Sequence, residues 1–202
     1  MMTKRPFRLM LSAAAALLLL ASCQETADYD EFHDWKSRNE AFIDSIATVC
    51  KANADGCWQR FLVFDRIDED TKGNTAQWDN SEYVYCHVEA EGTGTESPFF
   101  TDSIKVNYRG RLIPSDSYPE GRVFDQTYKT SVLDPSINVP ACLYMGSLVK
   151  GFTTAAQEMT EGDIWRIYIP ASLAYRSSKK DENIPAYSAL IFDLHLVKVI
   201  HN

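Results

Sequence analysis

The sequence has neither an excess of positive charge nor a recognisable metal-binding pattern. Its 202 residues carry 20 Lys and Arg against 28 Asp and Glu, a formal net charge of -8. A chain this acidic repels the phosphates of nucleic acid, so we exclude nucleic acid from the expected partners. No cysteines are arranged as CxxC, and no histidines have the spacing of zinc ligands. We therefore predict no metal and no cofactor, and we interpret the scattered histidines as surface or strand residues: His33, His87, His195 and His201.

Long apolar runs are also missing, apart from one near the start. This run, Leu9–Ala21, has about thirteen residues, whereas a helix that crosses a bilayer needs roughly twenty. It follows a basic segment and ends in Leu20-Ala21-Ser22-Cys23, which resembles the lipobox of bacterial lipoproteins. Residues 1–22 are therefore predicted to be a lipoprotein signal peptide. The resemblance implies a lipid anchor at Cys23 in the bacterial cell envelope, at the outer membrane, facing either the periplasm or the cell surface.

Cysteine is present in a number that permits disulfides. If Cys23 carries the lipid, four cysteines remain, in a compartment where disulfides form. Cys50 and Cys57 could bridge across the end of a helix. Cys86 lies on the apolar face of an expected strand, where a buried free thiol is favoured. The pairing among these three and Cys142 is not decided by the sequence.

The segment 23–80 is predicted to be a tether, one amphipathic helix and a linker. Apolar residues recur at helical spacing from Asp28 to about Ala52, and Asn53 and Gly56 supply the stop. Residues 57–64 follow as a short apolar extension of undecided type. A lone helix cannot bury its apolar stripe, so it must pack on the rest of the chain or on a second copy of itself. Homodimerisation through this helix is therefore a hypothesis.

The remaining segment, 81–202, has the pattern of an α+β domain. Apolar and polar residues alternate in four stretches as in half-buried strands. A short helix is predicted over Phe152–Met159, with its stop at Gly162. We expect an antiparallel sheet with one helix on one face. The predicted strands are Tyr83–Glu89, Ser103–Tyr108, Ile164–Ile169 and Ala189–Val199.

Five short motifs follow one another through this domain. They are VNYRG (106–110), VFDQ (123–126), MGSLVKGF (145–152), IPASLAY (169–175) and IPAYSALIFDL (184–194). Their order and spacing resemble the FKBP-type peptidyl-prolyl cis/trans isomerases. The resemblance implies a bent antiparallel sheet with a short helix packed on it, isomerase (rotamase) activity without a cofactor, and proline-containing client polypeptides whose folding is assisted in the cell envelope. It also implies binding of macrolides of the tacrolimus type.

The resemblance assigns a site to nine residues. For any one of its aromatic residues taken alone, ordinary core packing is the favoured explanation, and Asp125 could equally be a turn residue; the complete set favours a site. Phe152 would form the floor, and Tyr175 would donate its hydroxyl to the substrate backbone. The catalytic residues implied are Tyr108, Phe124, Asp125, Tyr175 and Phe192, and the substrate-binding residues are Leu148, Val149, Phe152 and Ile184.

The sequence departs from the family at several of these positions. Phe152 stands where the family usually has Trp, which predicts weaker macrolide binding. Arg176 stands where Gly usually follows the tyrosine, which predicts a differently set loop. Insertions at 114–120 and 129–139 lengthen two loops at the rim of the expected site. The alternatives to an enzyme are a non-catalytic FKBP-like chaperone or binding module and, third, a structural lipoprotein.

Overall fold

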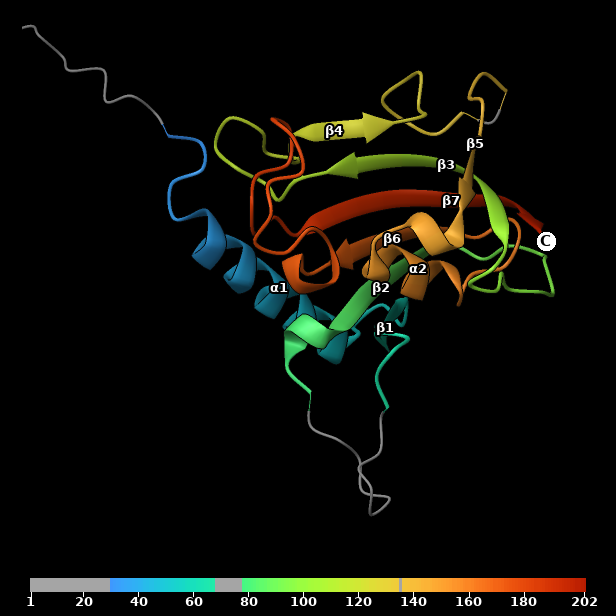
Figure 1. Ribbon diagram of the computed structural model, residues 1–202, viewed down its shortest axis with the longest axis horizontal. Helices are drawn as coiled ribbons and strands as arrows, with labels where there is room; N and C mark the ends of the chain where they lie inside the picture. The colour runs from blue at the N-terminus through green and yellow to red at the C-terminus, as the bar shows by residue number, and fades with distance from the viewer. Residues whose placement is uncertain (1–29, 68–77, 135) are drawn as a thin grey trace, which may run out of the picture. The chain divides into compact units, whose positions relative to one another are not determined.

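The computed structural model describes residues 30–67, 78–134 and 136–202 (Figure 1). The predicted signal peptide and the anchor Cys23 lie outside the described residues, as does most of the predicted linker. Phe32–Asn202 form one compact unit. Among the described residues, no helix combines the length and the apolar character needed to cross a membrane.

The unit is built on a seven-stranded antiparallel sheet in the order β1-β2-β6-β7-β3-β4, with β5 paired to the same edge of β3 as β4 (Figure 1). The longest pairing joins β3 to β7 in the middle of the sheet. The strands are β1 (Trp58–Leu62), β2 (Tyr83–Ala90), β3 (Ser103–Arg111), β4 (Val123–Gln126), β5 (Ala141–Tyr144), β6 (Ile164–Ile169) and β7 (Leu190–Ile200).

All four predicted strands are confirmed, as β2, β3, β6 and β7. On β7 the predicted apolar face is buried, with Leu194 fully inaccessible and Phe192 only 7% exposed. β3 runs three residues further than predicted, to Arg111, because β7 pairs with it throughout. The undecided stretch 57–64 contains β1, which forms the edge of the sheet beside β2. β4 and β5 were not predicted.

The short helix α2 (Lys150–Ala156) is confirmed, but its predicted end is wrong. It stops at Gln157, and Met159 is buried in the turn that follows. Gly162, the predicted stop, has φ 97, and a Cβ added to it would lie 3.0 Å from the Cα of Gly92. This glycine therefore serves a tight turn before β6, where two backbone segments meet.

The N-terminal helix is confirmed as α1 (Trp35–Ala52), but it begins after the left-handed Asp34 and not at Asp28 as predicted; it ends at Asn53, whose φ of 41 is also left-handed. The expected short helix on one face of the sheet is α2, and α1 is a second helix on the sheet, in line with the alternative that it packs on the rest of the chain. Phe42 of α1 contacts Tyr168 of β6, with ring centroids 6.1 Å apart. Tyr168 and its neighbour Ile167 point to opposite faces because side chains alternate along a strand, and α2 lies on the face of Ile167. The two helices therefore cover opposite faces, and α1 packs on its own chain.

The described cysteines are unpaired. The possible bridge between Cys50 and Cys57 is not formed. Cys86 is a fully buried thiol, as expected, and burial raises its pKa well above the ordinary value. Cys142 is exposed.

Candidate functional site

Three aromatic side chains from three other elements meet around Phe192 of β7. The ring of Phe152, from α2, meets it edge-on at 5.1 Å between centroids, and Phe124, from β4, does so at 5.6 Å. Tyr108 of β3 lies 6.3 Å away at a tilt of 57°. Phe152 and Phe192 are buried, whereas Tyr108 and Phe124 are half-buried. These four residues, called the aromatic cluster below, form an apolar surface that is open on the side of β3 and β4.

The register of the sheet brings these rings together. Gly110 of β3 pairs with Phe192 on one side and with Asp125 on the other. A Cβ at Gly110 would lie 2.5 Å from the ring of Phe124 and 2.8 Å from that of Phe192. Only glycine leaves room for both rings against the strand. Gly110 is not among the predicted site residues, although a glycine inside a strand often marks a close approach of other groups to the backbone.

A polar pair borders the aromatic cluster. The hydroxyl of Tyr108 donates a hydrogen bond to Oδ2 of Asp125 at 2.6 Å. Burial, together with this bond to a carboxylate, raises the pKa of Tyr108 well above its ordinary value. The phenol therefore stays protonated at physiological pH, and Asp125 is exposed and held in one direction by it.

Tyr175 lies within electrostatic reach of this pair. It follows the short helix η3 (Ala171–Leu173) and is half-buried. Burial raises its pKa, and the negative charges of Asp181 and Asp125 raise it further. Its hydroxyl is thus a neutral donor, and the ammonium of Lys180 lies 5.5 Å from its ring centroid.

Arg176, which stands where the family usually has glycine, keeps a glycine-like backbone. Its φ is 59, in the left-handed region. Its N–H donates to the carbonyl of Ala171 at 2.9 Å, and its carbonyl accepts from the N–H of Tyr187 at 2.7 Å. The arginine thus has the backbone conformation that a glycine would adopt, and its presence alone does not require a different loop. The neighbouring backbone bonds hold the strained residue in place.

The remaining predicted residues lie on two loops. Ile184 is 4% exposed, and its N–H donates to Oδ1 of Asp181 at 3.2 Å. Arg122, just before β4, donates to the carbonyl of Asn183 at 2.7 Å, so it ties the Ile184 loop to the strand of Phe124. This contact could not be predicted from the sequence, because the two residues are 61 positions apart and share no local pattern. Leu148 and Val149 form the half-buried link into α2.

Helix α1 positions the chain between Ile184 and Phe192. Trp35 donates its indole N–H to the hydroxyl of Ser188 at 2.9 Å, and Asn39 accepts from a backbone N–H one residue later. Both side chains are buried. The N-terminal helix therefore contributes to the placement of the aromatic cluster.

A separate cavity of about 870 Å³ lies between α1, the short helix η1 (Asn80–Glu82) and the loop after β6. It is lined by charged groups of both signs and by none of the nine predicted site residues. We place the candidate site at the aromatic cluster because the apolar rings and the oriented polar pair are there.

The fold and the cluster define an immunophilin-like domain. The sequence profile of the FKBP-type peptidyl-prolyl cis-trans isomerase family matches residues 94–197, so the chain belongs to this family. It is 38% identical over 104 residues to the peptidyl-prolyl cis-trans isomerase Mip of Coxiella burnetii, an overlap of 52% of this chain and 40% of that protein. It is 34% identical over 108 residues to the outer membrane protein MIP of Legionella longbeachae, an overlap of 54% and 40%. The chain thus spans less than half the length of these relatives.

Among solved structures, the chain resembles a peptidyl-prolyl cis-trans isomerase of Pseudomonas syringae pv. tomato. The TM-score is 0.55 at 21% sequence identity, and the overlap covers 86% of this chain and 98% of that one. At this identity the likeness establishes the fold alone. It extends over more of this chain than the family profile does.

Proposed function

We propose that this protein is a peptidyl-prolyl cis/trans isomerase that acts on proline-containing client polypeptides. The observation that carries the proposal is the aromatic cluster with an oriented Tyr108–Asp125 pair at its open side. Membership of the FKBP-type family supports it.

The reaction needs no covalent step. Rotation about the bond before proline breaks amide resonance, with a barrier of about 18–20 kcal/mol. The twisted amide has lost charge separation, so water stabilises it less than it stabilises the planar amide. An apolar surface that holds the prolyl ring and fixes the neighbouring carbonyl therefore binds the transition state more tightly than the ground state. The side chains of the cluster supply such a surface.

The aromatic residues take the following roles in this proposal. The prolyl ring sits on Phe152 as the floor, with Tyr108, Phe124 and Phe192 as walls. Phe152 and Phe192 are fixed by their edge-on contact, which keeps the surface preorganised. Ile184 closes the site from its loop.

The polar residues orient the peptide. Asp125 places its carboxylate against the twisting amide, and Tyr175 donates its hydroxyl to the substrate backbone. The N–H of Leu148 already donates to the carbonyl of Met145 at 3.2 Å. We therefore assign the contact with a ligand carbonyl to the N–H of Val149, the residue that caps α2.

The proposed setting is the bacterial cell envelope, with a lipid anchor at Cys23 that follows a signal peptide at 1–22. The lipobox-like sequence supports this, as does the outer-membrane name of the relative from Legionella longbeachae. The predicted domain 81–202, within the compact unit Phe32–Asn202 that also holds α1 and β1, would act on exported clients, and the start of the segment 23–80 would link this unit to the membrane. A homodimer through α1 stays a prediction, which a monomer in sedimentation at micromolar concentration would remove.

The test is the rate of cis/trans exchange in short Xaa-Pro peptides with the full chain in detergent. We expect acceleration, and we expect about a tenfold or larger loss in Asp125→Leu and Tyr175→Phe, because each removes a hydrogen bond with a charged or oriented partner. Two exposed residues of the same rim, Asp116 and Tyr118, provide matched controls. Asp116→Leu and Tyr118→Phe should keep full activity.

Three outcomes separate the candidate functions. Acceleration that a tacrolimus-type macrolide blocks supports an enzyme that uses the aromatic cluster. Acceleration without inhibition keeps the enzyme and attributes the weaker macrolide binding to Phe152, which Phe152→Trp should reverse. A folded protein without acceleration for several Xaa residues is the binding module instead.

A further inference from the structure

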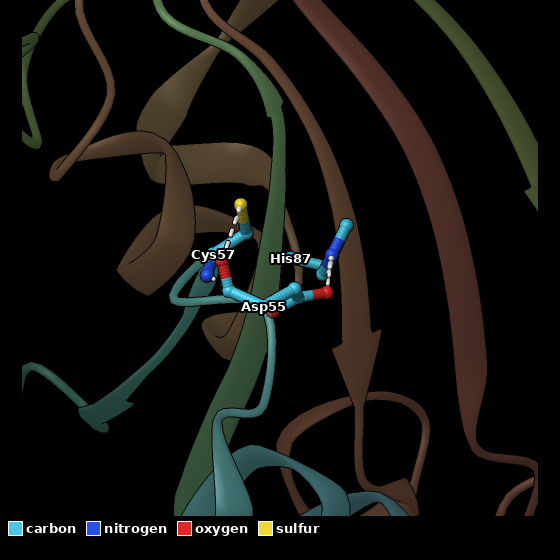
Figure 2. Close-up of side chains that lie close together, drawn as sticks. All are labelled: Asp55, Cys57 and His87. Atoms are coloured by element: carbon cyan, nitrogen blue, oxygen red, sulfur yellow. Dashed lines mark hydrogen bonds and ion pairs between the residues drawn. The ribbon is translucent and has the colours of Figure 1, made fainter.

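Three residues with metal-binding side chains meet on the face of the sheet opposite the aromatic cluster. Asp55 and Cys57 lie in the turn between α1 and β1, and His87 lies on β2 (Figure 2). Cys86, the residue before His87, pairs with Ile167, and Ile167 pairs with Phe192, so Cys86 lies on the same face of the sheet as Phe192. Because side chains alternate along a strand, His87 points away from the aromatic cluster.

The donor atoms are close enough to share one ion. A carboxylate oxygen of Asp55, Sγ of Cys57 and a ring nitrogen of His87 all lie within 4.8 Å of one another. Oδ2 of Asp55 is 2.9 Å from Nε2 of His87. In a tetrahedral zinc site, with bonds of about 2.0–2.3 Å, neighbouring donors lie roughly 3.3–3.6 Å apart. Side-chain movements on the order of 1 Å would therefore complete the geometry.

The turn that carries two of these donors is already held in place. The N–H of Cys57 donates to Oδ1 of Asp55 at 3.0 Å, and its carbonyl accepts from Val88 at 2.9 Å. The side chain of Asn53 caps the start of β1 by accepting from the N–H of Trp58 at 2.9 Å. Because backbone bonds fix the turn against β2, the donors are preorganised.

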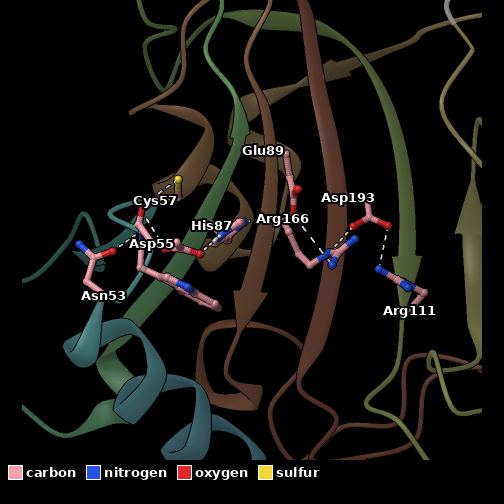
Figure 3. A network of polar contacts seen from close by, with 9 residues as sticks. Asn53, Asp55, Cys57, His87, Glu89, Arg111, Arg166 and Asp193 are labelled. Atoms are coloured by element: carbon pink, nitrogen blue, oxygen red, sulfur yellow. Dashed lines mark hydrogen bonds and ion pairs between the residues drawn. The ribbon is translucent and has the colours of Figure 1, made fainter.

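A second carboxylate orients the histidine. Nδ1 of His87 is 3.1 Å from Oε1 of Glu89, which itself lies 3.9 Å from the guanidinium of Arg166 (Figure 3). Metal-bound histidines commonly donate their second ring N–H to a carboxylate in this way. The indole of Trp58 packs edge-on against the imidazole, 5.0 Å between centroids, and limits its rotation. Nε2 is thus the nitrogen that faces Asp55 and Cys57.

We propose that Asp55, Cys57 and His87 form a binding site for a zinc-like divalent transition metal, with Glu89 as the residue that orients His87. One thiolate, one imidazole and one carboxylate are zinc ligands and are poorly suited to Mg²⁺ or Ca²⁺. The side chain of Asp55 is 51% exposed, so the fourth position is open to water. Binding replaces the thiol proton of Cys57 and the proton that Nε2 of His87 donates to Asp55, and both protons are released to solvent.

The site would join the α1–β1 turn to the sheet, and this sets what binding should change. An ion that binds only the folded chain raises the unfolding temperature by mass action. The aromatic cluster lies on the other face, so isomerase activity should be the same with and without the ion. Under this proposal His87 is a metal ligand, which replaces the prediction that the chain binds no metal.

The experiment is a zinc titration of the full chain in detergent after dialysis against a chelator, in a Cys23→Ser background so that this thiol does not compete. We expect one Zn²⁺ per chain, a higher unfolding temperature, and thiolate-to-metal absorption when Co²⁺ is used. Cys57→Ser and His87→Gln should each weaken binding at least tenfold, and Glu89→Gln about tenfold. The matched control is Cys142→Ser, at an exposed cysteine away from the site, which should bind as the parent does.

Two results would overturn the proposal. The first is no saturable binding by the parent at micromolar zinc. The second is unchanged affinity in Cys57→Ser, which keeps the size of the half-buried side chain and so is the variant least prone to unfold. If either occurs, Asp55 and His87 form only an ion pair that joins the turn to β2.

Discussion

Asn39 and Ala189 are separated by 150 residues in the sequence, and Oδ1 of Asn39 accepts a hydrogen bond of 2.7 Å from the backbone N–H of Ala189. The amide nitrogen of the same side chain donates to the carbonyl of Trp35 at 2.6 Å. Asn39 is 2% exposed and Ala189 is 1% exposed, so water cannot replace either bond. This residue therefore fixes α1 to the segment that leads into β7 and Phe192.

Removing this side chain should destabilise the whole unit. In Asn39→Ala the N–H of Ala189 would be buried without a partner, which costs about 1–3 kcal/mol. The measurement is urea unfolding followed by fluorescence. Ser37→Ala, on the exposed side of the same helix, should change the free energy of unfolding by less than about 0.5 kcal/mol. Equal effects of the two variants would mean that α1 is not anchored through Asn39.

Gly110→Ala should reduce isomerase activity more than stability. The added methyl group would lie 2.5 Å from the ring of Phe124, and the ring would have to move out of the aromatic cluster. A displacement of about 1 Å at a substrate-positioning group can lower the rate on the order of a hundredfold. The measurement is the rate of exchange in an Xaa-Pro peptide, beside thermal unfolding of the same sample.

A double mutant identifies the cause of that loss. If Gly110→Ala acts by displacing the ring, it should have little further effect once Phe124→Leu has removed the ring. Rate losses that multiply in the double mutant would show that the two positions act independently, and Gly110 would then have another role.

Arg176→Gly should stabilise the protein. A residue with a Cβ in the left-handed region is disfavoured by roughly 1–2 kcal/mol, and Arg176 has φ 59. Glycine has a larger entropy in the unfolded chain, so the net gain expected is about 1 kcal/mol. Arg176→Ala is the control, since it removes the side chain and keeps the strain. A gain in both variants would attribute the effect to the lost guanidinium and not to the backbone.

The parts of the fold that the sequence predicts are those with a long, regular pattern. β2, β6 and β7 alternate over six residues or more, and α1 repeats its apolar positions over 18 residues. β4 and β5 have four residues each, too few for alternation to be recognised. They form because β3 offers them an edge, which is a tertiary effect.

In the candidate site, too, the residues that lie in local motifs can be predicted, and the contacts between distant segments cannot. The motifs predict its aromatic residues because each lies in a short string that resembles the family, such as VFDQ around Phe124. Contacts between distant segments escape such reasoning. His87 and Asp55 are 32 residues apart, and only the pairing of β1 with β2 brings them together. The predicted absence of a metal site rested on local spacing, which cannot detect a site made by sheet register.

His201 should stabilise the fold at mildly acidic pH and less at alkaline pH. Its imidazole bonds to Asp102 at 2.8 Å and to Glu96 at 3.2 Å, and these bonds raise the pKa of His201. The pKa of Asp102 is lowered, first by the N–H of Phe99 and also by His201. The contribution of His201 to stability is complete below its unfolded pKa of about 6.5 and is lost as the pH rises through the raised pKa, while the contribution of Asp102 is present above about pH 3.9.

His201→Gln should therefore lower the unfolding temperature more at about pH 5.5 than at about pH 8.5. Asn202→Ala removes contacts in the same cluster without a titrating group, so its effect should be the same at both. An equal loss for His201→Gln at the two pH values would mean that the charge of His201 does not stabilise the fold.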